Sequence, residues 1–130
     1  MSALDRSQGS PLDALITPVL DGWRDAINER QPERVAEFFT NDALFQGLHP
    51  EHSIGRLGVV DYYRSQSIGL RGEYRVLESS RLAPDVIVAY VHVDFSFADG
   101  RVLPVHLTVV LREVGGVWLI SHYHVSKIEA

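Results

Sequence analysis

Residues 85–128 read DVIVAYVHVDFSF-ADG-RVLPVHLTVVLR-EVGG-VWLISHYHVSKI, and this stretch decides the fold. Apolar side chains occupy almost every odd position, whereas the even positions mix polar and apolar residues. Because side chains alternate across a strand, the pattern predicts strands over 85–97, 101–112 and 117–128. The short turns between them make these strands antiparallel, and a β-rich run at 74–82 adds a fourth.

Turn chemistry sets the expected register of this sheet. A three-residue turn at Ala98-Asp99-Gly100, with Gly100 left-handed, makes opposed residue numbers sum to an even value. The same parity at the last hairpin would place all odd-numbered side chains of the three strands on the helix-covered face. The predicted opposed pairs are Val93–Val105, His92–His106, His106–His124 and Thr108–His122.

The first half of the chain carries helical signals instead. Ser10-Pro11-Leu12-Asp13 predicts a helix start, with Ser10 as the cap, and Pro18 predicts a kink or a later start. Gln31-Pro32-Glu33 begins a short second helix that Thr40-Asn41-Asp42 stops. A brief strand at 43–46, a loop at 47–55 and a third helix at 56–68, ended by Gly69, would follow. The apolar stripe of the first helix consists of Leu12, Leu15, Ile16, Val19, Trp23 and Ile27.

Helices followed by a curved antiparallel sheet predict one α+β domain over residues 10–130, after a disordered polar tail at 1–9. The 130 residues include 45% hydrophobic and 22% charged side chains, a globular composition. A net charge of −5 without basic runs argues against nucleic acid or an anionic membrane as partner. The chain has no cysteine, signal-peptide pattern or membrane-length apolar run, so a cytoplasmic location is expected.

The C-terminal string resembles a known ending. Leu107-Thr108-Val109-Val110-Leu111, Gly116, Trp118, Ile120 and 122–126 (HYHVS) look like the end of SnoaL-like members of the NTF2-like superfamily, shared by the association domain of calcium/calmodulin-dependent kinase. Trp23, Phe38-Phe39, Asp42-Ala43, Phe45, Gly55 and Tyr62-Tyr63 match the N-terminal half. Residues 45–50 (FQGLHP), Gly55-Arg56 and 121–128 (SHYHVSKI) look most like SgcJ/EcaC-type proteins, which are associated with enediyne polyketide pathways.

The resemblance implies a cone-shaped fold, usually dimeric, with a cavity between helices and sheet. Its members include isomerases, cyclases and dehydratases as well as proteins that only bind or assemble, so the fold does not supply the activity. The kinase association domain has cavity arginines at the positions of Val109 and Val125, which favours an apolar ligand here. No residue matches the aspartate base of ketosteroid isomerase.

An apolar cavity with a few polar groups is the usual form of a small-molecule site. His49 could move protons near neutral pH, and Tyr123 could donate to an enolate-like oxygen, so both are catalytic candidates. The alternative is a solvated loop histidine and a core tyrosine bonded to backbone. The predicted cavity residues are Trp23, Phe39, Phe45, Gln46, His49, Tyr63, Leu107, Val109, Ser121, Tyr123 and Val125.

The even face of the sheet predicts a homodimer interface, because a wide mixed patch is self-complementary. His92, His106 and His124 on neighbouring strands could instead bind Zn²⁺ or Fe²⁺. The interface reading is favoured, and no metal or cofactor is expected. The predicted interface residues are Tyr90, His92, His106, Thr108, Trp118, His122 and His124.

Two functions remain at this point. One is an accessory enzyme of polyketide biosynthesis that acts on an apolar, polyketide-like intermediate without a cofactor. The other is a non-catalytic ligand-binding or dimeric assembly module. An enzyme needs a titratable group that points into the cavity, whereas a binding protein needs only shape.

Overall fold

The computed structural model describes residues 11–128, so the predicted tail at 1–9 and the Ser10 cap lie outside the described residues. The described chain forms three helices and one six-stranded sheet, in the order β2-β1-β6-β5-β4-β3. The helices are α2 (Asp13–Asn28), α3 (Pro32–Ala36) and α4 (Arg56–Arg64), and the strands are β1 (Phe39–Gln46), β2 (Ser53–Ile54), β3 (Arg71–Ala83), β4 (Val86–Ser96), β5 (Val102–Val114) and β6 (Val117–Lys127).

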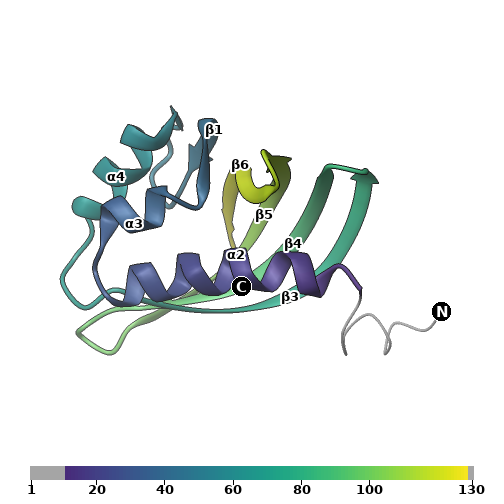
Figure 1. The fold of residues 1–130 in the computed structure, drawn as a ribbon. Helices are drawn as coiled ribbons and strands as arrows, with labels where there is room; N and C mark the ends of the chain where they lie inside the picture. Colours follow the sequence, from purple (N-terminus) through teal and green to yellow (C-terminus); the bar gives the residue numbers. More distant parts are fainter. Residues whose placement is uncertain (1–10, 129–130) are drawn as a thin grey trace.

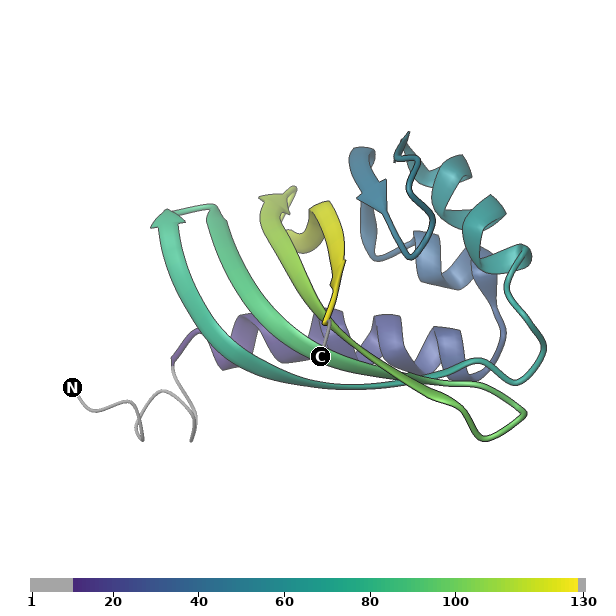
Figure 2. The same ribbon diagram turned by 180° about the vertical axis from the view of Figure 1, so that it is seen from behind.

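The long strands β3, β4 and β5 curve around α2, and α3 and α4 sit beyond one end of that helix (Figure 1). The reverse view shows the same arrangement, with the opposite face of the sheet left without a helix (Figure 2). Every strand pair is antiparallel except β1–β6, which is parallel. The predicted α+β class is therefore confirmed.

Between β4 and β5 the predicted register is confirmed. His92 lies opposite His106 and Val93 opposite Val105, and Gly100 has the expected positive φ of 90°. The odd-numbered side chains at 87–95 and 105–111, such as Val91 and Leu107, are buried on the helix-covered face. The three-residue turn therefore sets this hairpin as the sequence predicts.

Between β5 and β6 the predicted register is wrong. Gly115 and Gly116 both have positive φ, 58° and 83°, and form a two-residue turn that pairs Val114 with Val117. From this turn to Ile120, the numbers of opposed residues therefore sum to an odd value. Ser121 then forms a bulge in β6, and beyond it the sum is even again but larger by two than in the predicted pairs. The observed pairs are His106–Ser126, Thr108–His124 and Val110–His122.

The two-residue turn reverses the predicted facing of β6 before Ser121, and the bulge restores it afterwards. Ile120 is fully buried, whereas Val117 is 55% exposed, the opposite of the predicted alternation. After the bulge, Tyr123 and Val125 are buried as predicted. One extra residue therefore changes which side chains of this strand reach the core.

The boundaries of three N-terminal elements also differ from prediction. Residues 40–42 do not stop a helix but belong to β1, because Phe39 pairs with Ile120 of β6. Helix α4 ends at Arg64 instead of residue 68, where the Ser65 hydroxyl donates to the Tyr62 carbonyl at 2.6 Å. Helix α2 continues through Pro18, and β2 lies within the predicted loop.

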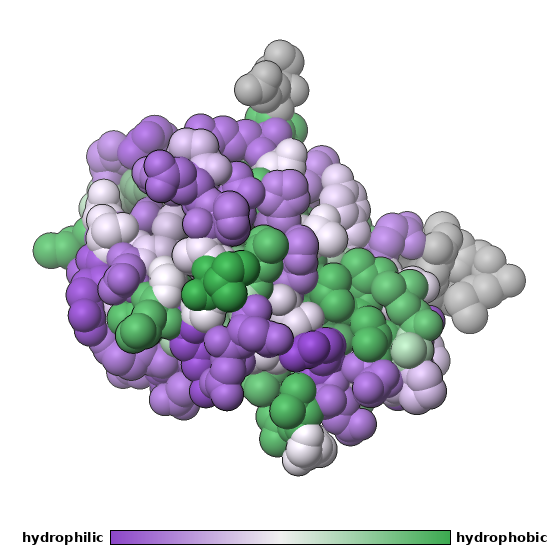
Figure 3. Space-filling view, turned by 90° about the horizontal axis from the view of Figure 1, so that it is seen from above, coloured by the Kyte–Doolittle hydropathy of each residue, from purple (hydrophilic) through white to green (hydrophobic). Residues whose placement is uncertain are grey.

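The core lies between α2 and the concave face of the sheet and contains mainly aliphatic and aromatic side chains. Exposed apolar residues such as Leu57 form separate groups on a mostly hydrophilic surface (Figure 3). Within residues 11–128, no helix has the length and apolarity needed to span a bilayer.

Candidate functional site

The predicted cavity side chains meet as an aromatic cluster inside the cone. Tyr123 is its centre: its ring stacks on Phe45 with centroids 4.5 Å apart and lies 5.9 Å from Trp23 and 5.8 Å from Phe39. Tyr63 packs edge-on against Phe45 at 5.7 Å. All five residues are buried, so aromatic rings fill the space between helix and sheet where the resemblance implies a hollow.

A short hydrogen-bond chain joins three of these rings. Trp23 Nε1 donates to the Tyr63 hydroxyl at 3.3 Å, and the Tyr63 and Tyr123 hydroxyls lie 3.1 Å apart. The three groups hold three hydrogens and form two hydrogen bonds, so one hydroxyl hydrogen has no acceptor among residues 11–128. Such a buried donor is a point where an acceptor oxygen would bind favourably.

Burial is the main cause that raises the pKa of both Tyr63 and Tyr123 far above the ordinary tyrosine value. Both phenols therefore stay protonated at neutral pH and act as hydrogen-bond donors. Among residues 11–128, tyrosine is the only ionisable side chain in the buried core. Within residues 11–128, the buried core therefore holds no carboxylate or imidazole that could serve as a base.

Three predicted cavity residues are buried on the helix-covered side of the sheet, and two others lie elsewhere. Ser121 forms the bulge and donates to the Val110 carbonyl at 3.3 Å. Gln46 lies opposite His124 on the outer side of the sheet, and its amide donates to the Pro50 carbonyl at 3.0 Å. The three buried positions are Leu107, Val109 and Val125.

The catalytic candidates His49 and Tyr123 do not share a site. His49 is exposed on the loop after β1, where its Nδ1 accepts from the Glu51 amide at 3.3 Å. It borders a shallow hollow of about 590 Å³ between this loop and α4, whereas Tyr123 lies in the buried cluster. Tyr62, which the sequence analysis did not single out, separates the two regions: its hydroxyl accepts from the Leu48 amide at 2.8 Å and its ring packs on Phe45.

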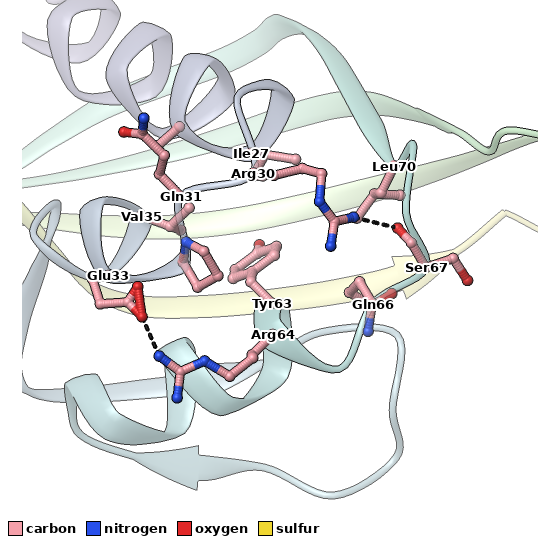
Figure 4. A pocket seen from close by; sticks show the side chains of 12 residues that line it. Ile27, Arg30, Gln31, Glu33, Val35, Tyr63, Arg64, Gln66, Ser67 and Leu70 are labelled. Atoms are coloured by element: carbon pink, nitrogen blue, oxygen red, sulfur yellow. Dashed lines mark hydrogen bonds and ion pairs between the residues drawn. The ribbon is translucent and has the colours of Figure 1, made fainter.

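A more enclosed cavity of about 230 Å³ opens among the helices (Figure 4). We call it the Tyr63 pocket, because the Tyr63 ring lies between the helices that surround it. Ile27, Val35, Tyr63 and Leu70 give it a buried apolar floor, and polar side chains surround it. The lining residues are Ala26, Ile27, Arg30 and Gln31 from the end of α2, Pro32, Glu33 and Val35 from α3, and Tyr63, Arg64, Gln66, Ser67 and Leu70 from α4 and the segment after it.

Of this lining, the sequence analysis singled out only Tyr63 as a site residue. The other residues come from three segments that meet only in the fold. The single local signal was Pro32 at the start of α3, which marks the corner but not a pocket. Arg30 has a positive φ of 56°, unusual for a residue other than glycine, and its sequence neighbours do not reveal it.

The predicted interface histidines lie on the outer face of the sheet. His92 Nε2 and Asp94 Oδ1 are 2.9 Å apart, and the rings of Tyr90 and His106 have centroids 5.0 Å apart. His124 lies beside Thr108 rather than His106. The three histidines are therefore not in one row, and no group of three potential metal ligands occurs within residues 11–128.

Trp118 does not share this face, which corrects its place among the predicted interface residues. The two-residue turn pairs it with Glu113, on the helix-covered side. There it packs against the core and borders an apolar hollow with Leu15 and Pro18 of α2. The guanidinium of Arg81 lies 5.8 Å from its ring centroid.

Comparisons with known proteins agree with this fold. A family model described as a SnoaL-like domain matches residues 16–129. No curated protein matches the chain. Because the structural similarities reported next are below 25% identity, they support the fold alone.

Three solved structures illustrate the likeness. An uncharacterised cystatin-like protein from Caulobacter vibrioides has a TM-score of 0.77 at 24% identity, over 92% of each chain. A ketosteroid isomerase-like protein from Erwinia carotovora atroseptica has a TM-score of 0.74 at 20% identity, over 94% of this chain and all of the other. A putative calcium/calmodulin-dependent kinase II association domain from Xanthomonas campestris has a TM-score of 0.72 at 19% identity, over 87% and 85%. With its helices on a curved sheet and a family match over most of its length, this chain belongs to the SnoaL-like domain family.

Proposed function

We propose that this protein binds a small, largely apolar molecule in the Tyr63 pocket. The observation that carries the proposal is the pocket itself: a partly enclosed cavity with a buried apolar floor and a polar rim. Small-molecule sites have this composition, since the apolar floor supplies affinity and the few polar groups orient the ligand. Tyr63 links the pocket to the aromatic cluster through its bonds to Trp23 and Tyr123.

Non-catalytic binding is the better supported of the two functions. A cofactor-free proton transfer needs a group that changes charge near neutral pH beside the ligand. The phenols of Tyr63 and Tyr123 stay protonated because burial raises their pKa, and His49 is exposed and outside the pocket. These residues support recognition of an acceptor oxygen rather than removal of a proton.

The ligand class that we propose is a polyketide-derived intermediate. The support for this class is the resemblance of residues 45–50 and 121–128 to SgcJ/EcaC-type proteins, together with the apolar pocket floor. The pocket volume of about 230 Å³ would hold only part of an extended polyketide, such as one aromatic ring system.

A neutral aromatic probe tests the binding proposal. Saturation-transfer NMR with 2-naphthamide is expected to show binding to the wild type. A tryptophan at the rim, Ser67→Trp, should abolish it, whereas Thr17→Trp on the exposed side of α2 adds the same ring away from the pocket and should not. Equal binding by both variants would refute the proposal, and so would a wild type that binds neither 2-naphthamide nor its carboxylate counterpart, 2-naphthoate.

A homodimer through the outer face of the sheet is a second proposal, favoured by the composition of that face. Beside its histidines, its centre carries hydroxyl and apolar side chains such as Thr108, Val110 and Tyr90, while Glu73 and Arg75 lie at its β3 edge. An apolar centre with a charged rim is typical of protein interfaces. No helix covers this face (Figure 2).

Sedimentation velocity tests the dimer. The wild type is expected to sediment as a dimer, and Val110→Glu as a monomer, because the variant places a charge at the centre of the interface. A monomeric wild type, or a dimer that Val110→Glu does not disturb, would refute this second proposal.

A further inference from the structure

We propose that the ligand of the Tyr63 pocket carries a carboxylate and that Arg30 binds this group at the rim. The inference rests on the binding function proposed above. It adds the chemical class of the polar end of the ligand, which neither the fold nor the family comparison supplies.

Arg30 occupies a position that normally belongs to glycine. Its amide donates to the Ile27 carbonyl at 3.0 Å and the Gln31 amide donates to the Ala26 carbonyl at 2.9 Å, the two bonds of a Schellman motif that ends α2. This motif requires a left-handed backbone at the residue after the helix cap, which is Arg30, with a φ of 56°. Residues other than glycine are uncommon in this conformation and cluster at functional sites, and here the Arg30 side chain borders the pocket.

The two arginines at the pocket rim differ in whether an acidic side chain pairs with them. Arg64 forms an ion pair with Glu33, so its charge is already compensated (Figure 4). Arg30 forms no ion pair with residues 11–128 and donates only to the Ser67 carbonyl, at 3.2 Å. An arginine has five N–H donors, so most of those on Arg30 remain available to a ligand.

The side chain of Arg30 is also held in place for this role. Its bond to Ser67 joins the end of α2 to the segment after α4, across the pocket mouth (Figure 4). Glycine at this position would close the helix without strain but would offer no donor. Uncompensated positive charge beside an apolar floor suits a molecule with an apolar body and one anionic end, and the planar guanidinium matches a carboxylate best.

A matched pair of probes tests this inference. Titrations of 2-naphthoate and 2-naphthamide at neutral pH compare a carboxylate with a neutral amide on the same ring. We expect the wild type to bind naphthoate about tenfold more tightly, a typical gain for a charge-assisted hydrogen bond. Arg30→Gln should remove this preference, and Arg30→Lys should keep part of it.

Arg34→Gln is the control, because it removes one positive charge from the same corner without touching the pocket. It should keep the wild-type preference, which high salt should reduce. Equal affinity of the wild type for both probes, or loss of the preference in Arg34→Gln, would overturn the role of Arg30 and leave the binding proposal standing. If neither probe binds the wild type, both proposals fail.

Discussion

The hydrogen-bond chain in the core predicts unequal costs for two similar substitutions. Tyr63 is the middle member, bonded to Trp23 Nε1 and to the Tyr123 hydroxyl, whereas Tyr123 is at one end. Tyr63→Phe breaks both bonds and leaves two buried hydrogens without acceptors, on Trp23 and on Tyr123. Tyr123→Phe breaks one bond and leaves a single such hydrogen, the same number as in the wild type.

Each additional unpaired buried donor costs about 1–3 kcal/mol. Tyr63→Phe should therefore destabilise the protein by about 1–3 kcal/mol more than Tyr123→Phe, which should cost about 1 kcal/mol or less. In the double variant, only the Trp23 N–H lacks an acceptor, so its cost should be smaller than the sum of the two single costs.

Urea denaturation of the three variants at neutral pH measures these differences, provided that the dependence of unfolding on urea is the same in each. Because each substitution removes one hydroxyl from a buried phenol, the variants are matched in volume. Equal costs for the single variants, or a larger cost for Tyr123→Phe, would refute the reasoning.

Three further predictions follow from individual side chains. Because burial raises the pKa of Tyr63 and Tyr123, these phenols ionise at lower pH in the unfolded chain than in the folded protein. The free energy of unfolding should therefore fall above about pH 10, by about 1.4 kcal/mol per pH unit for each phenol. Urea midpoints that stay constant above this pH would contradict the prediction. Arg30→Gly should raise the free energy of unfolding by about 1 kcal/mol, because glycine adopts the left-handed backbone freely; urea denaturation would show a loss if this is wrong. Gly22→Ala adds a Cβ that would lie 2.2 Å from the half-buried ring of Phe38. Displacing this ring should offset the roughly 1 kcal/mol that alanine gains over glycine inside a helix, so the thermal midpoint should not rise, and a clear rise would count against this packing.

Much of the sheet could be predicted because its signals are local. Alternation from Ile87 to Leu111 depends on neighbouring residues only, and one turn with Gly100 sets the register of that hairpin. The aromatic members of the cluster could also be predicted, since Trp23, Phe45 and Tyr123 occupy inward positions of their own elements.

The errors occur where the outcome depends on contacts between distant segments. The bulge at Ser121 resolves a conflict between the two-glycine turn and the burial of Tyr123, and its position is set by the whole β5–β6 pairing. Residues 40–42 carry turn signals, yet they lie in β1, between Phe39 and Leu44, which both pair with β6. The error at Trp118 has a local cause instead, because the two-residue turn at Gly115 and Gly116 shifts the alternation of β6 before the bulge.

Alternating side chains and two kinds of turn were enough to specify a helical layer on a curved antiparallel sheet, because each of these preferences acts over a few residues. The Tyr63 pocket, the place of Arg30 at its rim and the Trp23–Tyr63–Tyr123 chain depended on the packing of α2, α3 and α4 against the sheet. They required tertiary structure because each joins groups that are distant in the chain, and no local pattern records the distance between them.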